Sequence, residues 1–188
     1  GQGYQPQHVW RPLIDNFVHL GGSGATLGLV LALLWAVREG PQRRIAQVSV
    51  LPTLFNVNEL LLFGLPVVLN PRYLLPFVAM PVGLALGGWL LVHQGWLPVR
   101  AQAVHWTTPV LLSGWQLTGS WLGVAWQAAA VAISTACYLP VVRRAEQARA
   151  QQQRDALAAT SQAIVQPRRQ HRSALQRHDQ VGEIARGL

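Results

Sequence analysis

The sequence predicts an all-α membrane protein with three transmembrane helices and two re-entrant hairpins, followed by a cytoplasmic helical tail. Three apolar runs are each long enough to cross a bilayer, which takes about 20 residues. Two further apolar segments are interrupted by proline and glycine. The region 143–188 is polar and rich in arginine. This contrast in composition predicts a membrane domain at 1–142 and a helical tail or linker at 143–188.

The three predicted transmembrane helices are residues 17–37, 73–93 and 119–142. Each contains glycine, alanine, serine or threonine, which let helices in a membrane approach closely. Tryptophans lie near several of their ends, where the membrane–water interface favours them. These tryptophans are Trp35, Trp89, Trp96, Trp121 and Trp126.

Two broken apolar segments, residues 45–70 and 99–118, predict the re-entrant hairpins. Each is too interrupted for one spanning helix and too apolar for a solvated loop. Non-helical backbone at membrane depth is tolerated where it is buried in protein or lines a watery cavity. Paired segments of this kind indicate the binding site of a transporter. The interrupting residues are Pro52, Gly64 and Pro66 in the first segment, and Pro109 and Gly114 in the second.

The arginines predict the orientation in the membrane. They cluster after the first and the third apolar run, and such clusters are expected on the cytoplasmic side. The first hairpin then enters from the cytoplasm and the second from outside, and the C-terminus is cytoplasmic. The clustered residues are Arg38, Arg43, Arg44, Arg143 and Arg144.

The third run is expected to continue as a cytoplasmic helix until Pro167. Residues 143–165 contain neither glycine nor proline and are dominated by alanine, glutamine, arginine and leucine, which favour helices. The polar residues after Pro167 predict either a second helix or a solvated tail.

The net charge of +8 does not indicate a nucleic-acid-binding protein. Nine of the fifteen arginines lie at or after Arg143, and most others lie in short gaps between apolar runs. That distribution is typical of loops that flank membrane spans rather than of one basic face. The single cysteine, Cys137, lies within an apolar run, so no internal disulfide is expected.

No pattern in the chain predicts a catalytic centre, a metal site or a cofactor. His8, His93, His171 and His178 have no metal-ligand spacing. The glycines of residues 21–24 follow no predicted strand and precede no lysine, which excludes a phosphate-binding loop. No nucleophile–base motif is present.

Glu59 is the strongest candidate for a binding residue. It is the only acidic residue between Gly40 and Ala145. A carboxylate in an apolar segment is costly and normally faces a cavity or a partner. With Asn56 and Asn58 beside it, it suits a ligand with many hydroxyl groups, because carboxylates accept and amides both donate and accept hydrogen bonds. The alternative is that Glu59 caps a broken helix.

The second hairpin carries the motif HWTTP, which contains His105, Trp106, Thr107 and Thr108. An indole next to hydroxyl groups suits stacking on a sugar ring. The alternative is an interfacial tryptophan before a proline-marked helix start. His19 is either a polar lining residue or an interfacial histidine.

The stretches FVHLGGSGATLGL, LFNVNELLLFGLPVVLNP and WTTPVLLSGWQLTGSW resemble the membrane permease subunit (EIIC) of the lactose/cellobiose group of the bacterial sugar phosphotransferase system. The resemblance covers about residues 13 to 143 and implies that Glu59, Asn58 and Asn56 contact a bound disaccharide. It also implies that Trp106, Thr107 and Thr108, with the adjacent His105, border the sugar. The family's proline after the glutamate is Leu60 here.

The resemblance further implies a cytoplasmic EIIB-type partner that carries a phosphocysteine, and the phosphoryl chemistry belongs to that partner. Permeases of this family extend further toward the N-terminus. The chain is therefore expected to match the C-terminal half only, with a homodimer formed through the preceding half.

Three functions remain open from the sequence. The first is a permease component that binds and translocates a disaccharide such as cellobiose, chitobiose or lactose. The second is a membrane sensor, because RHDQVGEIARGL faintly resembles the lead-in to a cyclic-di-GMP phosphodiesterase (EAL-type) domain after Leu188. The third is a degenerate structural remnant.

Overall fold

The computed structural model describes residues 17–65, 67, 69–98, 100 and 104–186, and these residues form helices and turns without a β-strand. The prediction of an all-α protein is confirmed for this part of the chain. Contacts divide the chain into two compact units, Gly1–Ala145 and Glu146–Leu188. The candidate site lies in the first unit.

The first predicted span, residues 17–37, is wrong as a single helix. The regular helix found within it is shorter and runs from Thr26 to Ala36 (α2). The preceding glycines and Ala25 have left-handed backbone angles, with φ of 81° at Gly21, 93° at Gly22, 81° at Gly24 and 52° at Ala25. A right-handed helix cannot include such residues. We call residues 20–25 the glycine loop.

The first broken segment forms two short helices joined by a turn. Helix α3 is Pro41–Leu54 and α4 is Glu59–Gly64. Pro52 lies inside α3, and the chain instead breaks at residues 55–58, where Asn56 has a φ of 62°. A Cβ on Gly64 would lie 3.0 Å from the Ile45 side chain, so the two ends of this segment lie together. We call residues 55–58 the first tip.

The second broken segment also returns to its starting point. It follows α5, which is Pro71–His93 and confirms the second predicted helix, and it ends with α6, Leu112–Thr118. The Arg100 amide donates to the Leu117 carbonyl at 2.9 Å, which joins the two ends. Residues 105–109 lie between them, and we call these the second tip. Residues 99 and 101–103 lie outside the described part of the chain.

Helix α7 runs from Trp121 to Arg186 and provides the whole second unit that is described. The expected end at Pro167 is wrong, because the helix continues through this residue. Proline removes one backbone hydrogen bond of a helix and tends to kink it, but the turns before and after Pro167 are helical here. The described side chains from Gln151 to Ala163 are exposed.

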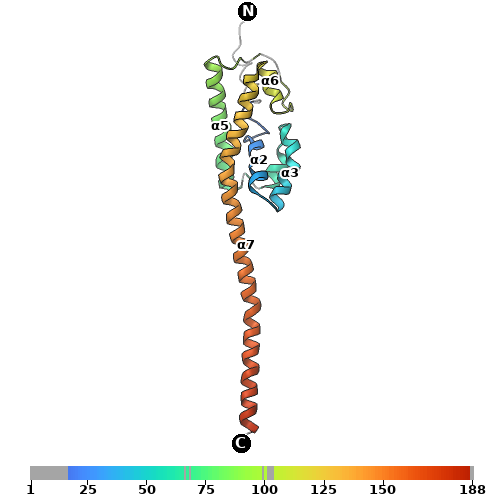
Figure 1. Cartoon of the computed structure of the whole chain (residues 1–188), viewed down its shortest axis with the longest axis vertical. Coiled ribbons are helices and arrows are strands. Elements are labelled where there is room, and N and C mark those ends of the chain that lie inside the picture. The colour runs from blue at the N-terminus through green and yellow to red at the C-terminus, as the bar shows by residue number, and fades with distance from the viewer. Residues whose placement is uncertain (1–16, 66, 68, 99, 101–103, 187–188) are drawn as a thin grey trace, which may run out of the picture. The chain divides into compact units, whose positions relative to one another are not determined.

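Within the first unit, α2 and α5 pack against the first turns of α7 through small residues (Figure 1). A Cβ on Gly28 of α2 would collide with Ser134 of α7, and one on Gly87 of α5 would lie 2.7 Å from the Trp126 ring. Helix α3 packs against α2. Leu29, Leu33, Leu61 and Tyr138 are fully buried in the resulting core.

Two of the described helices are long and apolar enough to cross a membrane, namely Pro71–His93 and Trp121–Ala163. Much of their surface is apolar and exposed. On α5, Leu75, Val78, Val82 and Leu86 are 56–74% exposed and recur at intervals of three or four residues. This spacing places them on one face of the helix, as expected for contact with lipid.

We predict that Gly28→Ala destabilises the protein by about 1–3 kcal/mol, because the added methyl group overpacks the α2–α7 interface. The backbone nitrogen of Thr135, 2.7 Å from the ideal Cβ position, leaves little room to adjust. Thermal unfolding in detergent provides the measurement. Gly83→Ala is the matched control, because a Cβ there meets nothing within 4 Å. Equal melting temperatures for the two variants would contradict the close α2–α7 contact.

Candidate functional site

The two tips meet through the side chain of Asn56. Its Nδ2 donates to the Trp106 carbonyl at 2.7 Å and to the Thr108 carbonyl at 3.4 Å. Its Oδ1 accepts from the Gly21 amide at 2.9 Å. One amide side chain thus joins the first tip, the second tip and the glycine loop.

A backbone hydrogen bond next to Asn56 strengthens this junction. The Val110 amide donates to the Leu54 carbonyl at 3.1 Å. Asn56 also has the left-handed conformation that asparagine tolerates better than most residues. The residue type therefore serves both the sharp turn and the contact between the tips.

Asn58 attaches the first tip to the start of α2. Its Nδ2 donates to the Ser23 carbonyl at 2.9 Å and to the Thr26 hydroxyl at 3.0 Å. The side chain is buried, and a Cβ on Gly22 would lie 2.6 Å from its Cγ. Glycine at position 22 is therefore needed for the asparagine to fit.

The other face of the glycine loop is held by α7. The Tyr138 hydroxyl donates to the Gly24 carbonyl at 2.7 Å, and the Ser134 hydroxyl donates to the Ala25 carbonyl at 2.9 Å. Ser134 and Tyr138 are four residues apart and share one helix face. Both side chains are fully buried, so these bonds form away from water.

Glu59 occupies the first turn of α4, directly after the first tip. Its side chain is exposed, and among the described residues it has no hydrogen bond or ion pair. The capping alternative gains no support, since the carboxylate bonds no backbone amide of the described helices. In contrast to the two asparagines, Glu59 is available to a ligand.

The second tip presents an aromatic pair. The rings of His105 and Trp106 stack with centroids 6.1 Å apart and an interplanar angle of 26°. The Trp106 side chain is 58% exposed, and Nδ1 of His105 lies 2.7 Å from the Thr107 hydroxyl. The structure therefore brings an exposed indole, an imidazole and a hydroxyl to the junction with the first tip.

The structure places all seven predicted site residues on the two tips or directly after them. Their contact with a sugar stays a prediction. Sequence reasoning missed the supporting residues on α7, which include Gln127, Ser134 and Tyr138. The available signal was a set of polar side chains at intervals of seven and four residues on an apolar helix. Among the described residues, no three His, Cys, Asp or Glu side chains gather as a metal site would require.

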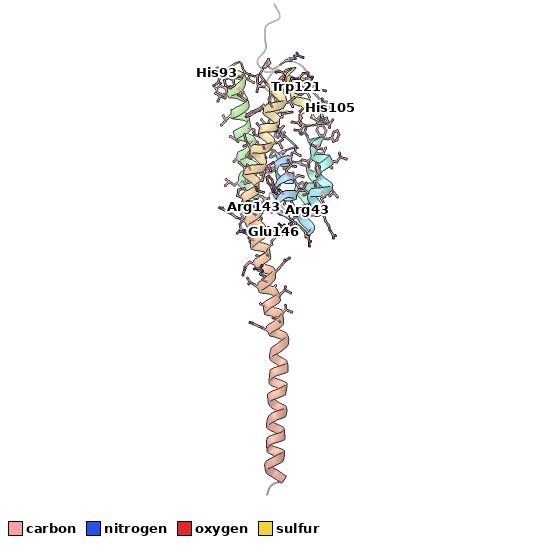
Figure 2. All side chains as sticks on the ribbon, viewed as in Figure 1. Arg43, His93, His105, Trp121, Arg143 and Glu146 are labelled. Carbon is pink, nitrogen blue, oxygen red and sulfur yellow. The ribbon has the colours of Figure 1, made fainter. Side chains whose placement is uncertain are left out.

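Figure 2 shows Arg43 and Arg143 at one end of the unit, and His93 and Trp121 at the opposite end. Arg43 also binds the end of α2, since one guanidinium nitrogen donates to the Leu34 carbonyl at 2.8 Å and the Val37 carbonyl at 2.7 Å. A cation at this position stabilises the helix C-terminus.

We predict that Asn58→Asp destabilises the protein by about 1–3 kcal/mol, because a carboxylate cannot donate to Ser23 and its oxygen faces that carbonyl. The melting temperature in detergent gives the test. Asn70→Asp is the matched control, because the Asn70 side chain bonds the described residues only through its oxygen, which accepts from the Arg72 amide at the start of α5. A control as damaging as Asn58→Asp would mean that the lost Nδ2 donor is not the cause.

The comparisons with known proteins point to one family. The family described as "Phosphotransferase system, EIIC" matches residues 2–81. The lichenan permease IIC component of Bacillus subtilis (strain 168) is 33% identical over 152 residues, which cover 80% of this chain and 34% of that protein. The cellobiose-specific EIIC component of Geobacillus stearothermophilus is 30% identical over 115 residues, covering 61% of this chain and 26% of that protein.

A solved structure agrees with these relatives. The crystal structure of the transporter ChbC, the IIC component of the N,N'-diacetylchitobiose-specific phosphotransferase system, matches with a TM-score of 0.71 and 34% identity. The match covers 74% of this chain and 33% of ChbC. The region compared thus spans about a third of the length of these proteins. Over that region, the chain belongs to the EIIC family of the phosphotransferase system, in its lactose/cellobiose group.

Proposed function

We propose that this chain forms the sugar-binding part of a permease that binds a β-linked disaccharide between its two tips. The observation that carries the proposal is the junction at Asn56, which brings the exposed Trp106 next to the first tip, and Glu59 directly follows that tip. The names of the relatives support the ligand class, since they specify cellobiose, lactose and N,N'-diacetylchitobiose.

The chemistry of the two tips suits such a ligand. The Glu59 carboxylate would accept hydrogen bonds from sugar hydroxyls, and charge-assisted bonds of this kind are the stronger ones. The Trp106 indole would stack on the apolar face of a pyranose ring. His105, Thr107 and Thr108 would border the sugar at the rim of the second tip.

Asn56 and Asn58 have a different part in this proposal. Their Nδ2 groups already donate to carbonyls or a hydroxyl of the protein. We therefore assign them the role of holding Glu59 and Trp106 in place. Any contact of theirs with the sugar would use the remaining oxygen lone pairs.

Both broken segments are proposed to be re-entrant in the membrane. Each one returns to its own start, at Ile45 and Gly64 in the first and at Arg100 and Leu117 in the second. With the end of the unit that bears Arg43 and Arg143 in the cytoplasm, the first segment enters from that side and the second from outside. Multiple passes and a cytoplasmic C-terminus follow from this arrangement.

Transport would proceed by alternating access. The sugar would enter from outside, bind between the tips and be exposed to the cytoplasm by a rocking movement of the surrounding helices. A cytoplasmic EIIB-type partner with a phosphocysteine would then phosphorylate it. The lactose-specific relatives of Staphylococcus aureus and Streptococcus mutans are named EIICB components, which supports a partner of this kind. We propose a homodimer formed through regions outside this chain.

We predict that Glu59→Gln lowers disaccharide affinity about ten-fold or more, because a charge-assisted hydrogen bond contributes roughly 1.5–3 kcal/mol. Calorimetric titration of the intact protein with cellobiose, chitobiose and lactose provides the measurement. Glu39→Gln is the matched control, since Glu39 is an exposed acid in the loop between α2 and α3. If a sugar binds the wild type and Glu59→Gln equally well, the assignment of Glu59 is wrong.

We predict that single cysteines at Gln42 and Arg72 react from the same side of the membrane. These positions flank the first broken segment, which would enter and leave on one side. Labelling with an impermeant maleimide in a Cys137→Ser background tests this in intact cells and inverted vesicles. Labelling from opposite sides would mean that the segment crosses the membrane.

A further inference from the structure

We propose that Gln127 on α7 is a positioning residue for the sugar site. It holds Leu111 in an unfavourable backbone conformation and thereby keeps the second tip against Asn56. The inference rests on the proposed function for its link to sugar binding. The geometry itself comes from contacts within the first unit.

Gln127 is fully buried, and its side chain makes three hydrogen bonds with residues at the start of α6. Its Oε1 accepts from the Leu111 amide at 2.7 Å and from the Gly114 amide at 3.0 Å. Its Nε2 donates to the Ser113 hydroxyl at 2.8 Å. The first amides of a helix lack partners within the helix, and the residue before α6 supplies no side-chain cap. Gln127 provides that cap from a different helix.

Leu111 has φ 78° and ψ −42°, a conformation that residues other than glycine rarely adopt. Its side chain is 43% exposed, so burial of the leucine does not explain why the chain turns this way. Such strain persists only where the surroundings impose it. The bond from Gln127 is made to the amide of this same residue.

Leu111 lies between the second tip and α6, and these two segments are held by different neighbours. On its N-terminal side, Val110 bonds the Leu54 carbonyl, and the carbonyls of the second tip accept from Asn56. On its C-terminal side, α6 lies against α7, where a Cβ on Gly123 would lie 2.5 Å from the Gly114 carbonyl. The backbone angle at Leu111 therefore decides where the second tip lies.

The structure consequently predicts that loss of the Gln127 amide frees Leu111 to relax and moves the second tip away from Asn56. A glycine at position 111 would adopt the same backbone angles at no steric cost. Leu111→Gly should therefore restore the position of the second tip and the sugar affinity when Gln127 is lost. This compensation is not expected if Gln127 only stabilises the fold.

The test compares Gln127→Leu, Leu111→Gly and the double variant in the intact protein. Thr135→Val is the control, because the buried Thr135 hydroxyl on α7 bonds only the Val131 carbonyl of its own helix among the described residues. If Gln127→Leu does not fold, Gln127→Asn, shorter by one methylene, replaces it. The first readout is disaccharide affinity by calorimetry. The second is the mobility of a nitroxide at Thr107→Cys in a Cys137→Ser background, measured without sugar.

We expect Gln127→Leu to lower affinity about ten-fold, in line with the usual energy of such strained residues, and to raise nitroxide mobility. The double variant should regain affinity by three-fold or more and restore the spectrum. The inference is overturned if Gln127→Leu leaves nitroxide mobility unchanged, if Thr135→Val has the same effect, or if Leu111→Gly gives no compensation. A wild type that binds none of the sugars refutes the proposed function instead, and the nitroxide spectra still decide the role of Gln127.

Discussion

Non-helical backbone inside an apolar protein needs hydrogen-bond partners, and the first unit depends on how this need is met. The glycine loop and the two tips meet where no regular helix supplies those partners. Side chains of Asn56, Asn58, Gln127 and Ser134 bond the free carbonyls and amides of these segments instead. An unsatisfied backbone group in a membrane costs several kcal/mol, so each of these side chains carries much of the local stability.

The polar residues of the unit therefore fall into two groups with different chemistry. Buried amides and hydroxyls bond the backbone and leave little capacity for a ligand. Glu59 and Trp106 are exposed instead, and Glu59 has no partner among the described residues. In the proposed site, the groups assigned to sugar recognition are left without partners while the polar scaffold around them is bonded, which would limit the reorganisation needed on sugar binding.

Helix α7 connects the parts of this scaffold. Ser134 bonds the glycine loop, and Gln127, seven residues earlier on the same face, bonds the start of α6. Small residues let the backbones approach closely enough for these side chains to reach, as at Gly28 and Gly123. Among the described residues, three other than glycine have a positive φ, and all of them lie in segments that this scaffold holds: Ala25, Asn56 and Leu111. In the part of the chain that the structure describes, backbone strain of this kind therefore gathers around the tips and the glycine loop.

Periodicity and composition alone determined the helical class, the extent of α5, and the presence of two interrupted segments with Glu59 and Trp106 on them. These features are local, since they depend on runs of apolar residues and on residue types that stand out within them. Only the tertiary structure decided that residues 18–25 are not helical, because the glycine loop is stabilised by Asn56, Asn58, Ser134 and Tyr138 from distant positions. The tertiary structure also decided that Asn56 and Asn58 hydrogen-bond backbone groups, and that Gln127 bonds the Leu111 amide. These hydrogen bonds join segments that lie far apart in the chain, so no local pattern predicts them.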